Sequence, residues 1–496
     1  MIPKRMHEYL TTVLTGQACE ERLIRQGSLR FMEFRSLDID HLHSLGITAD
    51  SLGPYVVVCM WDEESPIEIG GYLVVDNLSM GKPAMGGIRL ALDITPSKIH
   101  NLARGMTLKN AAAGLPYGGG KSGIVASQGL SKEEHEEVIK GFADLLYRYN
   151  GIYNPGPDVG TNDADMKTIV IENGLDNTLS KPEEMGGTFI DLFGGAAGGV
   201  VTALKTVVGE LDKFKKLPQF HDLTIPELQD VTVLIQGFGA VGANVAKILT
   251  MGDLSNTPLI VGISDKDGYL YFEEGLPVDT LFNLWKQHET AVRPFVEENK
   301  LYASEATGIT YSNNCNNLLR ESVFCFIPAA PVSNYLDVDK SSNPSITVDE
   351  MGKWRLVVEG ANTYSPDPEI KSRRLKMERL VYRDKGVIII PDYLVNSGGV
   401  IFAVQERYIP TPEHLQIPQS YLGDKEKVEE WLDKNTNEFK ELSKKRAEAG
   451  MKMRDEKISR NIIKFVNLLS QDANMLPSEA AEKIILSRIA SNEKRS

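Results

Sequence analysis

Lys121 stands among five glycines in the segment GLPYGGGKSG, a setting in which a lysine could either bind phosphate or act as a base. A phosphate-binding P-loop requires the pattern G-x-x-x-x-G-K-[ST], but Leu115 occupies the position of its first glycine. Gly118, Gly120 and Gly123 also form a G-x-G-x-x-G, yet the residues before them have the apolar spacing of a helix, whereas both phosphate motifs follow a strand. We therefore interpret both matches as coincidental, and the chemistry of Lys121 depends on the rest of the chain.

A second G-x-G-x-x-G, at Gly237, Gly239 and Gly242, follows the β-branched run VTVLIQ and begins an apolar helical pattern. In that context the glycines allow a tight turn and close approach of a pyrophosphate, and the helix N-terminus offers N–H donors. The next predicted strand, PLIVGISD, ends at Asp265, near the spacing at which an acid binds a ribose 2′-hydroxyl. This carboxylate favours NAD over NADP, although Lys266 beside it weakens the preference. The predicted cofactor turn also contains Phe238, Ala240 and Val241.

The composition argues against several classes of protein. The 496 residues contain 42% hydrophobic and 25% charged residues, as in a globular protein of two or three domains. A formal net charge of -14 argues against nucleic-acid binding, which rests on lysine and arginine neutralising phosphates. No apolar run is long enough for a signal peptide or a membrane span, the four cysteines are far apart, and the eight histidines lack metal-ligand spacing. We expect a cytoplasmic chain with reduced thiols, no metal site and no nucleic-acid or membrane partner.

Elements that alternate between strand and helix patterns must position these residues. Strand-like runs at 55–61 and 71–76 precede a long helix that ends before Gly114, and another helix is expected at 132–149. The segment NPGPDVGT is expected to be a loop, and the glycine-rich LFGGAAGGVV to be a hinge that begins a helix. Three later strand-like runs end in Pro, Gly or Asn, as at the carboxyl edge of a parallel sheet.

We therefore predict an α/β fold of two domains. An N-terminal α/β substrate and oligomerisation domain, residues 1–195, carries Lys121, and a Rossmann-type doubly wound domain, residues 196–404, binds the dinucleotide. The mixed-charge pattern near 423–460 is typical of solvated helices. We expect the C-terminal helices, residues 405–496, to pack back onto the first domain.

The order of short motifs along the chain resembles the glutamate/leucine/phenylalanine/valine dehydrogenase family. The motifs are GGIR (86–89), LARGMTLKNAAAGLPYGGGKSG, GPDVGT, QGFGAVG, PAA (328–330), EGAN (359–362) and NSGGV (396–400). The resemblance implies reversible oxidative deamination of an L-amino acid to a 2-oxo acid and ammonia, with hydride transfer from Cα to the nicotinamide of NAD or NADP. It also implies a homo-oligomer, a hexamer or an octamer, built through the first domain.

The resemblance assigns roles to individual residues. Lys121 matches the catalytic lysine, Lys109 the lysine that holds the substrate α-carboxylate, and Asp158 the carboxylate that moves protons to and from the amino nitrogen. Burial and a second cation, for which Lys109 is the candidate, would lower the pKa of Lys121 toward the working pH. Four further residues match positions of the family pattern, and either asparagine among them could instead stabilise a turn. These matches are Gly87 and Asn396 on the substrate side, and Ala329 and Asn362 on the cofactor side.

Three positions depart from the family pattern. Glutamate-using members carry a lysine before G-G-x-R and a hydroxyl seven residues after the asparagine of N-x-G-G-V, where this chain has Met85 and Ala403. Because an unpaired carboxylate in an apolar pocket costs on the order of several kcal/mol, we expect a leucine-, valine- or phenylalanine-like substrate. Ala196 stands where a threonine commonly helps to hold the nicotinamide amide. Two alternatives stay open: a glutamate dehydrogenase with a non-standard pocket, and a non-catalytic member that senses nucleotide or amino acid.

Overall fold

The structure is a computed structural model that describes residues 2–188, 194–252, 256–301 and 308–493. The chain divides into two compact units. Unit 1 contains Met1–Ile190, Val400–Met451 and Arg488–Ser496, and unit 2 contains Asp191–Gly399 and Lys452–Ser487. Each unit is organised around its own seven-stranded sheet, which confirms the predicted α/β fold of two domains.

The division differs from the predicted one in the C-terminal segment. Residues 452–487 belong to unit 2, whereas we expected all of 405–496 to accompany the first domain. The first two residues of the expected hinge, Leu192 and Phe193, lie outside the described residues, and the helix that follows them begins at Gly195.

The sheet of unit 1 has the strand order β1-β2-β3-β4-β6-β5-β7. Its strands are β1 (Leu23–Gln26), β2 (Leu29–Arg35), β3 (Val56–Asp62), β4 (Gly70–Asn77), β5 (Ala84–Ala91), β6 (Gly118–Val125) and β7 (Tyr153–Pro157). β5 runs parallel to β6 and to β7, and the remaining neighbours pair antiparallel. The glycine-rich segment around Lys121 is therefore a strand, and the first part of NPGPDVGT, expected as a loop, is also a strand.

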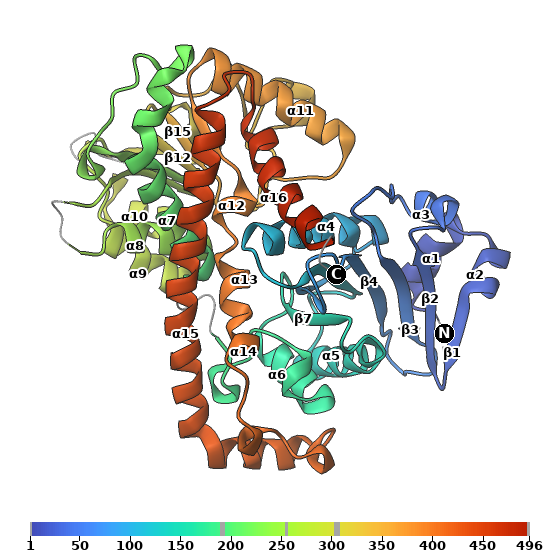
Figure 1. Cartoon of the computed structure of the whole chain (residues 1–496). Coiled ribbons are helices and arrows are strands. Elements are labelled where there is room, and N and C mark those ends of the chain that lie inside the picture. The colour runs from blue at the N-terminus through green and yellow to red at the C-terminus, as the bar shows by residue number, and fades with distance from the viewer. Residues whose placement is uncertain (1, 189–193, 253–255, 302–307, 494–496) are drawn as a thin grey trace. The chain divides into compact units, whose positions relative to one another are not determined.

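Helices cover both faces of this sheet (Figure 1). The helices are α1 (Lys4–Val13), α2 (Gly16–Arg22), α3 (Ile39–Ser44), α4 (Pro96–Ala112), α5 (Lys132–Tyr147) and α6 (Asp163–Asn173). Apolar residues of α1, α3 and α4 pack on one face, and those of α5 and α6 pack on the other. α4 begins where the side chain of Thr95 accepts a hydrogen bond from the Lys98 backbone N–H, with Pro96 in its first turn.

The sheet of unit 2 has the strand order β11-β10-β9-β8-β12-β15-β16. Its strands are β8 (Thr232–Gln236), β9 (Leu259–Asp265), β10 (Gly268–Tyr271), β11 (Thr310–Ser312), β12 (Cys325–Pro328), β15 (Leu356–Val358) and β16 (Ile388–Ile390), and a separate pair is β13 (Leu336–Asp337) with β14 (Ile346–Thr347). The strands from β9 to β16 in this order are parallel, and β10 and β11 add an antiparallel edge. The order reverses beside β8, as in a doubly wound dinucleotide fold.

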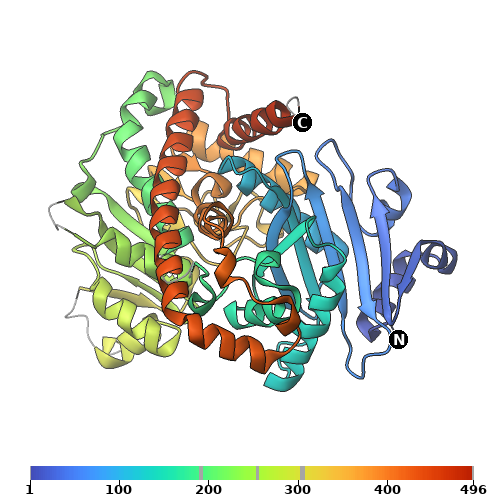
Figure 2. The same ribbon diagram turned by 60° about the horizontal axis from the view of Figure 1, so that its bottom comes forward.

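The helices of unit 2 include one that begins within the glycine motif, between its second and third glycines. They are α7 (Gly195–Glu210), α8 (Ala240–Leu249), α9 (Val278–His288), α10 (Val292–Glu298), α11 (Pro368–Glu378) and α12 (Asp392–Val395). Four of the described helices belong to the C-terminal segment of unit 1 or continue from one unit into the other. These are α13 (Gly398–Ala403), α14 (Gln405–Tyr408) and the 45-residue α15 (Lys425–Leu469), followed by α16 (Pro477–Glu493). In Figure 2 the orange-red coil of α15 bends sharply near its N-terminal end.

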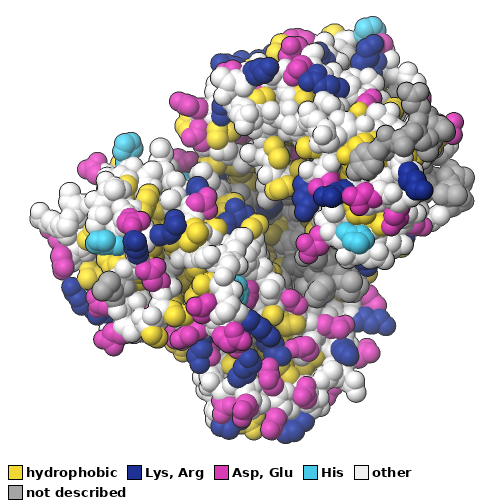
Figure 3. Space-filling view, turned by 180° about the vertical axis from the view of Figure 1, so that it is seen from behind, with side chains coloured by type: hydrophobic (Ala, Val, Ile, Leu, Met, Phe, Trp, Pro, Cys, Tyr) yellow, Lys and Arg dark blue, Asp and Glu magenta, His cyan; other side chains and the backbone are white. Residues whose placement is uncertain are grey.

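Charged side chains of both signs are mixed on the face drawn in Figure 3. None of the helices in the described part of the chain has both the length and the apolar character that crossing a bilayer requires. Within the same residues, no three His, Cys, Asp or Glu side chains gather in a way that could hold a metal ion.

Candidate active site

Lys121 projects from the middle of β6 toward the face of the sheet that α4 covers. Val125, which points to the same face as Lys121 by strand alternation, packs with α4, whereas Ile124 packs on the opposite face. The neighbouring glycines allow α4 to approach β6 closely: a Cβ on Gly119 would lie 2.1 Å from the Thr107 backbone nitrogen. The glycines therefore serve helix-on-sheet packing around a buried lysine, and the strand conformation excludes a P-loop.

The parallel pairing of β5, β6 and β7 places the predicted residues on one face. Met85 pairs with Gly119 and with Asn154, and Gly87 pairs with Gly156 in the next row. Since Ile88 pairs with Ser122, Gly87 also lies beside Lys121. Because Gly87 and Gly156 have no side chains, the sheet surface next to Lys121 is bare backbone. Asp158 follows directly after β7, in line with Arg89 of β5.

Three charged side chains meet at this surface. Arg89 Nε donates a hydrogen bond to Asp158 Oδ2 at 2.7 Å, and Lys121 Nζ lies 3.2 Å from the same oxygen. The side chain of Lys121 is only 7% exposed, compared with 21% for Asp158 and 29% for Arg89. A buried amine therefore shares one carboxylate oxygen with a more accessible guanidinium.

The surroundings shift both proton affinities in directions that suit acid–base chemistry. Burial lowers the pKa of Lys121 below its usual 10.5, the charge of Arg89 lowers it further, and Asp158 opposes both effects. Burial alone would raise the pKa of Asp158, but Lys121 and Arg89 together hold it below its usual 3.8. Asp158 is thus a carboxylate at neutral pH, and Lys121 loses its proton more easily than a free lysine.

Arg89 is the residue that the sequence analysis missed. We had named Lys109 as the second cation acting on Lys121, whereas Arg89 is a cation that the structure places against both Lys121 and Asp158. A signal was available, because Arg89 ends the GGIR motif and shares the alternation of Met85 and Gly87 along β5. Lys109 itself lies half-buried in the last turn of α4, two residues after Thr107.

Met85 and Ala403 both lie in unit 1. Met85 is 3% exposed on the same face as Lys121, one row away, beside the equally buried Asn154. Ala403 is half-buried at the end of α13. Three residues later, Glu406 forms a buried ion pair with Lys181 and accepts a hydrogen bond from the Thr188 backbone N–H at 3.0 Å. The positive charge of Lys181 is therefore already neutralised.

The second glycine motif lies between β8 and α8, in the context that the sequence predicts. Gly237 has a φ of +91°, and a Cβ there would lie 2.5 Å from the backbone of Ala330. A Cβ on Gly242 would lie 2.0 Å from Gly237 O, whereas one on Gly239 would meet no atom within 4 Å. Gly239 precedes α8, and no side chain caps this helix N-terminus. The N–H groups there can donate hydrogen bonds to a phosphate.

The other predicted residues of this turn have contrasting environments. Phe238 is 1% exposed and belongs to the core, Ala240 is exposed in the first turn of α8, and Val241 is half-buried. Ala329, directly after β12, is half-buried and donates its backbone N–H to Gln236 O at 2.7 Å. The cofactor-side residues after β8 and β12 are thus linked through the backbone.

Asp265 ends β9 as expected, but its carboxylate has structural partners. Its Oδ2 accepts hydrogen bonds from the Thr290 hydroxyl at 2.7 Å and from the backbone N–H groups of Ala291 at 2.8 Å and Val292 at 2.9 Å. Its Oδ1 accepts one from the Asp267 backbone N–H at 2.9 Å. Asp265 therefore holds the start of α10 and the β9–β10 turn, while the neighbouring Lys266 is exposed.

Asn362 and Asn396 lie together in unit 2. Asn396 donates from Nδ2 to Asn362 Oδ1 at 3.0 Å and to Gly360 O at 3.2 Å. Its own Oδ1 is buried and accepts no hydrogen bond within the described residues. Asn396 is 6% exposed whereas Asn362 is exposed. The α7 residue Ala196, where a threonine was expected, is half-buried in the first turn of that helix.

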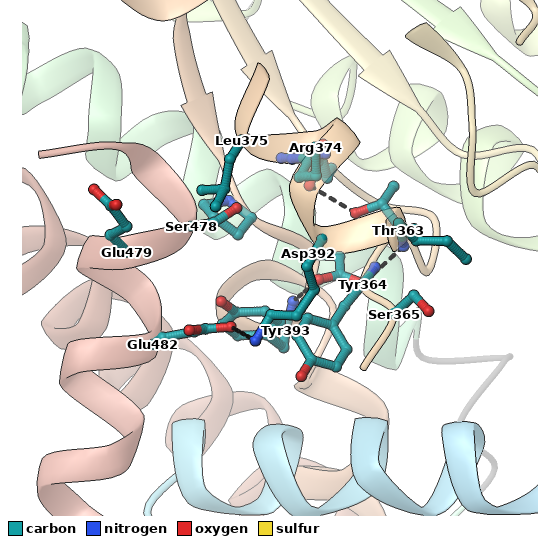
Figure 4. A pocket seen from close by; sticks show the side chains of 14 residues that line it. Thr363, Tyr364, Ser365, Arg374, Leu375, Asp392, Tyr393, Ser478, Glu479 and Glu482 are labelled. Atoms are coloured by element: carbon teal, nitrogen blue, oxygen red, sulfur yellow. Dashed lines mark hydrogen bonds and ion pairs between the residues drawn. The ribbon is translucent and has the colours of Figure 1, made fainter. Parts of the chain in front are cut away.

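A buried polar network fixes the loop that carries Asn362, and Figure 4 shows its members Arg374, Thr363, Tyr364 and Asp392. Glu359 accepts hydrogen bonds from the Tyr335 hydroxyl at 2.7 Å and from Arg374 Nη1 at 2.5 Å. Asp392 Oδ2 accepts from the backbone N–H groups of Thr363 at 2.8 Å and Tyr364 at 3.2 Å. The network borders a cavity of about 280 Å³ between α11, α12 and α16. It anchors Glu359, the first residue of EGAN, and the backbone directly after its last residue.

Two family models match this chain. One described as glutamate/leucine/phenylalanine/valine dehydrogenase covers residues 217–474, and one described as the dimerisation domain of Glu/Leu/Phe/Val dehydrogenases covers residues 57–173. The first model covers residues 217–399 and 452–474 of unit 2, including the glycine motif and both asparagines, and also residues 400–451 of unit 1. The second spans β5, β6 and β7, and thus Lys121, Asp158 and Arg89.

Relatives with similar sequences include glutamate dehydrogenases from three organisms. The chain is 31% identical over 377 residues to a glutamate dehydrogenase of Thermotoga maritima, which covers 73% of this chain and 76% of that protein. It is 28% identical over 453 residues to an NADP-specific glutamate dehydrogenase of Saccharolobus shibatae, covering 88% and 91%. An NAD-specific glutamate dehydrogenase of Staphylococcus aureus is 29% identical over 365 residues, covering 73% and 76%.

Solved structures share the fold. Plasmodium falciparum glutamate dehydrogenase 2 superposes with a TM-score of 0.62 at 17% identity, covering 99% of this chain and 96% of that one. A hetero-hexameric glutamate dehydrogenase from Thermus thermophilus, in a leucine-bound form, gives a TM-score of 0.58 at 20% identity, covering 100% and 97%. With the family models and the relatives, these observations show that the chain belongs to the glutamate/leucine/phenylalanine/valine dehydrogenase family and is an NAD(P)-dependent amino-acid dehydrogenase.

Proposed function

We propose that this chain catalyses the reversible oxidative deamination of an L-amino acid with an apolar side chain. The observation that carries this proposal is the cluster of Lys121, Asp158 and Arg89 beside the bare backbone of Gly87 and Gly156. A buried lysine of lowered pKa can take a proton, a neighbouring carboxylate can move another, and the two glycines leave room for a small substrate between strand and solvent.

The roles follow the chemistry of each group. Lys121 takes a proton from the water that adds to the imine carbon and holds it near the oxygen of the resulting carbinolamine. Asp158 moves the proton at the amino nitrogen, which leaves as ammonia. Lys109 binds the substrate α-carboxylate, and Asn396 contributes to orienting the amino-acid head. Each of these steps needs the substrate Cα over the glycines of β5 and β7.

NAD(P) fits the residues of unit 2. The uncapped N-terminus of α8, preceded by Gly237 and Gly239, suits the pyrophosphate, and Asn362 and Ala329 lie after the strands where the nicotinamide half is expected. When bound, the nicotinamide accepts the hydride from Cα. The carboxylate of Asp265 already accepts hydrogen bonds from backbone N–H groups, and the neighbouring Lys266 is exposed. Both observations support binding of NADP as well as NAD. We assign substrate binding and oligomerisation to unit 1 and dinucleotide binding to unit 2.

The apolar substrate class rests on the side chains that replace expected polar groups. Met85 is buried beside Gly119, one row from Lys121, and Ala403 carries no hydroxyl. Lys181, a buried cation of unit 1, forms an ion pair with Glu406, so its charge is already neutralised and does not compensate a substrate carboxylate. A second carboxylate in the substrate would therefore lose its hydration with no cation assigned to it.

Glutamate is the second candidate substrate, because the curated relatives described above are glutamate dehydrogenases. We further propose a homo-oligomer, a hexamer or octamer, assembled through unit 1, since the family model that covers 57–173 is described as a dimerisation domain. Light scattering of the purified chain measures this mass directly, and a monomer would contradict it.

The decisive experiment is a panel assay of NADH and NADPH formation at alkaline pH with L-leucine, L-valine, L-phenylalanine, L-tryptophan and L-glutamate. Turnover of apolar amino acids with little on glutamate supports the proposal. Turnover of glutamate alone keeps the reaction and rejects the pocket argument from Met85 and Ala403. Absence of turnover with every amino acid, in a folded protein that binds NADH, contradicts the proposed function.

A further inference from the structure

The Asp158 carboxylate is held asymmetrically. Both cations, Arg89 Nε at 2.7 Å and Lys121 Nζ at 3.2 Å, contact Oδ2. Within the described residues, Oδ1 accepts no hydrogen bond, although the side chain is 21% exposed. One oxygen is thus anchored and the other is left to a substrate group.

The backbone of Asp158 is fixed separately from its side chain. The Thr161 hydroxyl lies 2.9 Å from the Asp158 backbone nitrogen and donates to Ile88 O at 2.7 Å, which ties the end of β7 to β5. Arg89, the residue after Ile88, then reaches the carboxylate from the same strand. Thr161 therefore sets where Asp158 stands, and Arg89 sets which way its carboxylate points.

We propose that Arg89 is a positioning residue of the proposed deamination: it anchors Asp158 Oδ2, so that Oδ1 faces the amino nitrogen, and it keeps Lys121 from forming an exclusive ion pair with Asp158. This inference rests on the proposed function. Without the guanidinium, Lys121 and Asp158 would be two opposite charges in a buried site, and their mutual attraction would hold the lysine proton in place.

The charged and titratable groups around this pair define the electrostatic effect. Lys121 comes from β6, Asp158 from the end of β7 and Arg89 from β5, while the Tyr153 hydroxyl, on the opposite face of β7, donates a hydrogen bond to Gly86 O at 2.7 Å. Burial, together with the negative charge of Asp158, keeps the pKa of Tyr153 above its usual value, so the phenol stays neutral. Arg89 is thus a permanent charge that acts on both members of the pair.

Removing the charge of Arg89 should change the pKa values of Lys121 and Asp158 in the same direction. Arg89 lowers the pKa of Lys121 and contributes to lowering that of Asp158, so an uncharged replacement raises both. We expect Arg89→Gln to reduce kcat roughly tenfold to a hundredfold and to move the limb of the kcat–pH profile that reports Lys121 upward by about 1 pH unit. Arg89→Lys keeps the positive charge but not the geometry of the guanidinium hydrogen bond to Asp158. In this variant the limb of the kcat–pH profile that reports Lys121 should stay near its wild-type pH, while kcat stays reduced.

Arg148→Gln is a matched control. Arg148 has a side-chain exposure of 33%, close to the 29% of Arg89, and pairs with Glu33 at 3.4 Å in the same unit. We expect its kcat and pH profile to equal those of the wild type. A pH profile of Arg89→Gln that coincides with that of the wild type, or an unchanged kcat, would overturn the positioning role.

A measurement that needs no turnover separates this proposal from the proposed function. Trace labelling of the full chain with acetic anhydride across a pH series, followed by peptide mass spectrometry, reports the pKa of Lys121 from its relative rate of acetylation. The apparent pKa should be higher in Arg89→Gln than in wild type and unchanged in Arg148→Gln. If the apparent pKa of Lys121 is the same in wild type and in Arg89→Gln, the effect of Arg89 on Lys121 is overturned, even if the wild-type enzyme is active. If the pKa differs between the two proteins but the wild type shows no turnover, only the proposed function is rejected.

Discussion

The same letter pattern, G-x-G-x-x-G, occurs twice in this chain with different structural results. At Gly118–Gly123 it lies within strand β6, where a Cβ on Gly119 would lie 2.1 Å from the Thr107 backbone nitrogen of α4. At Gly237–Gly242 it turns from β8 into α8, and a Cβ on Gly239 would meet no atom within 4 Å. In unit 1 the glycines bring a helix onto a sheet around a lysine. In unit 2 they leave a helix N-terminus open for a phosphate.

The largest expected effect tests the lysine of the first pattern. Lys121→Met keeps the volume and removes the base, so we expect kcat to fall at least roughly a thousandfold while NADH still binds. Because the folded state lowers the pKa of Lys121, the ionised side chain reduces stability at pH 7, and this cost disappears as pH rises and the lysine loses its proton. The melting temperature at pH 7 should therefore not fall. Steady-state kinetics and calorimetry check both statements, with the exposed Lys98→Met as control.

The next effect compares one glycine from each pattern. Gly119→Ala forces β6 and α4 apart and should lower the free energy of unfolding by about 1–3 kcal/mol, as measured by urea denaturation. Gly239→Ala should leave stability nearly unchanged but weaken NADH binding at least about tenfold, because its methyl group enters the space of the pyrophosphate. If the two variants behaved alike in both assays, the structural contrast between the patterns would be wrong.

A smaller effect concerns the side-chain end of the substrate surface. Met85→Lys places a cation one row from Lys121, and we expect the ratio of kcat/KM for glutamate to that for leucine to rise roughly tenfold. Met85→Gln, which has similar length and no charge, should change the ratio much less. No gain on glutamate would show that Met85 does not face the substrate side chain.

The smallest effect concerns the cofactor. Lys266 is exposed beside the occupied carboxylate of Asp265, so Lys266→Ala should lower kcat/KM for NADPH relative to NADH only a few-fold, about 0.5–1 kcal/mol. Measuring both cofactors in the amination direction gives this ratio. A rise in the ratio would show that Lys266 does not contact the adenosine ribose.

Part of this architecture was readable from short-range patterns. The strand β8, the glycine turn and α8 are contiguous in sequence, and their apolar periodicity and turn chemistry are local properties. The long helix before Gly114 was predicted for the same reason and is observed as α4. The glycine-rich strands β6 and β7 were not, because glycine and proline normally indicate loops, and only the cover provided by α4 and the neighbouring strands makes them a sheet.

The sequence by itself determined the family and the two-domain α/β fold, and it singled out Lys121 and Asp158 as candidate catalytic residues, since all of these depend on motifs that can be read in order along the chain. The tertiary structure alone decided that Arg89 reaches Asp158, that backbone N–H groups occupy Asp265, and that residues 452–487 belong to unit 2. Each of these depends on contacts between segments far apart in the chain. Strand register and helix packing set such distances, and no local pattern records them.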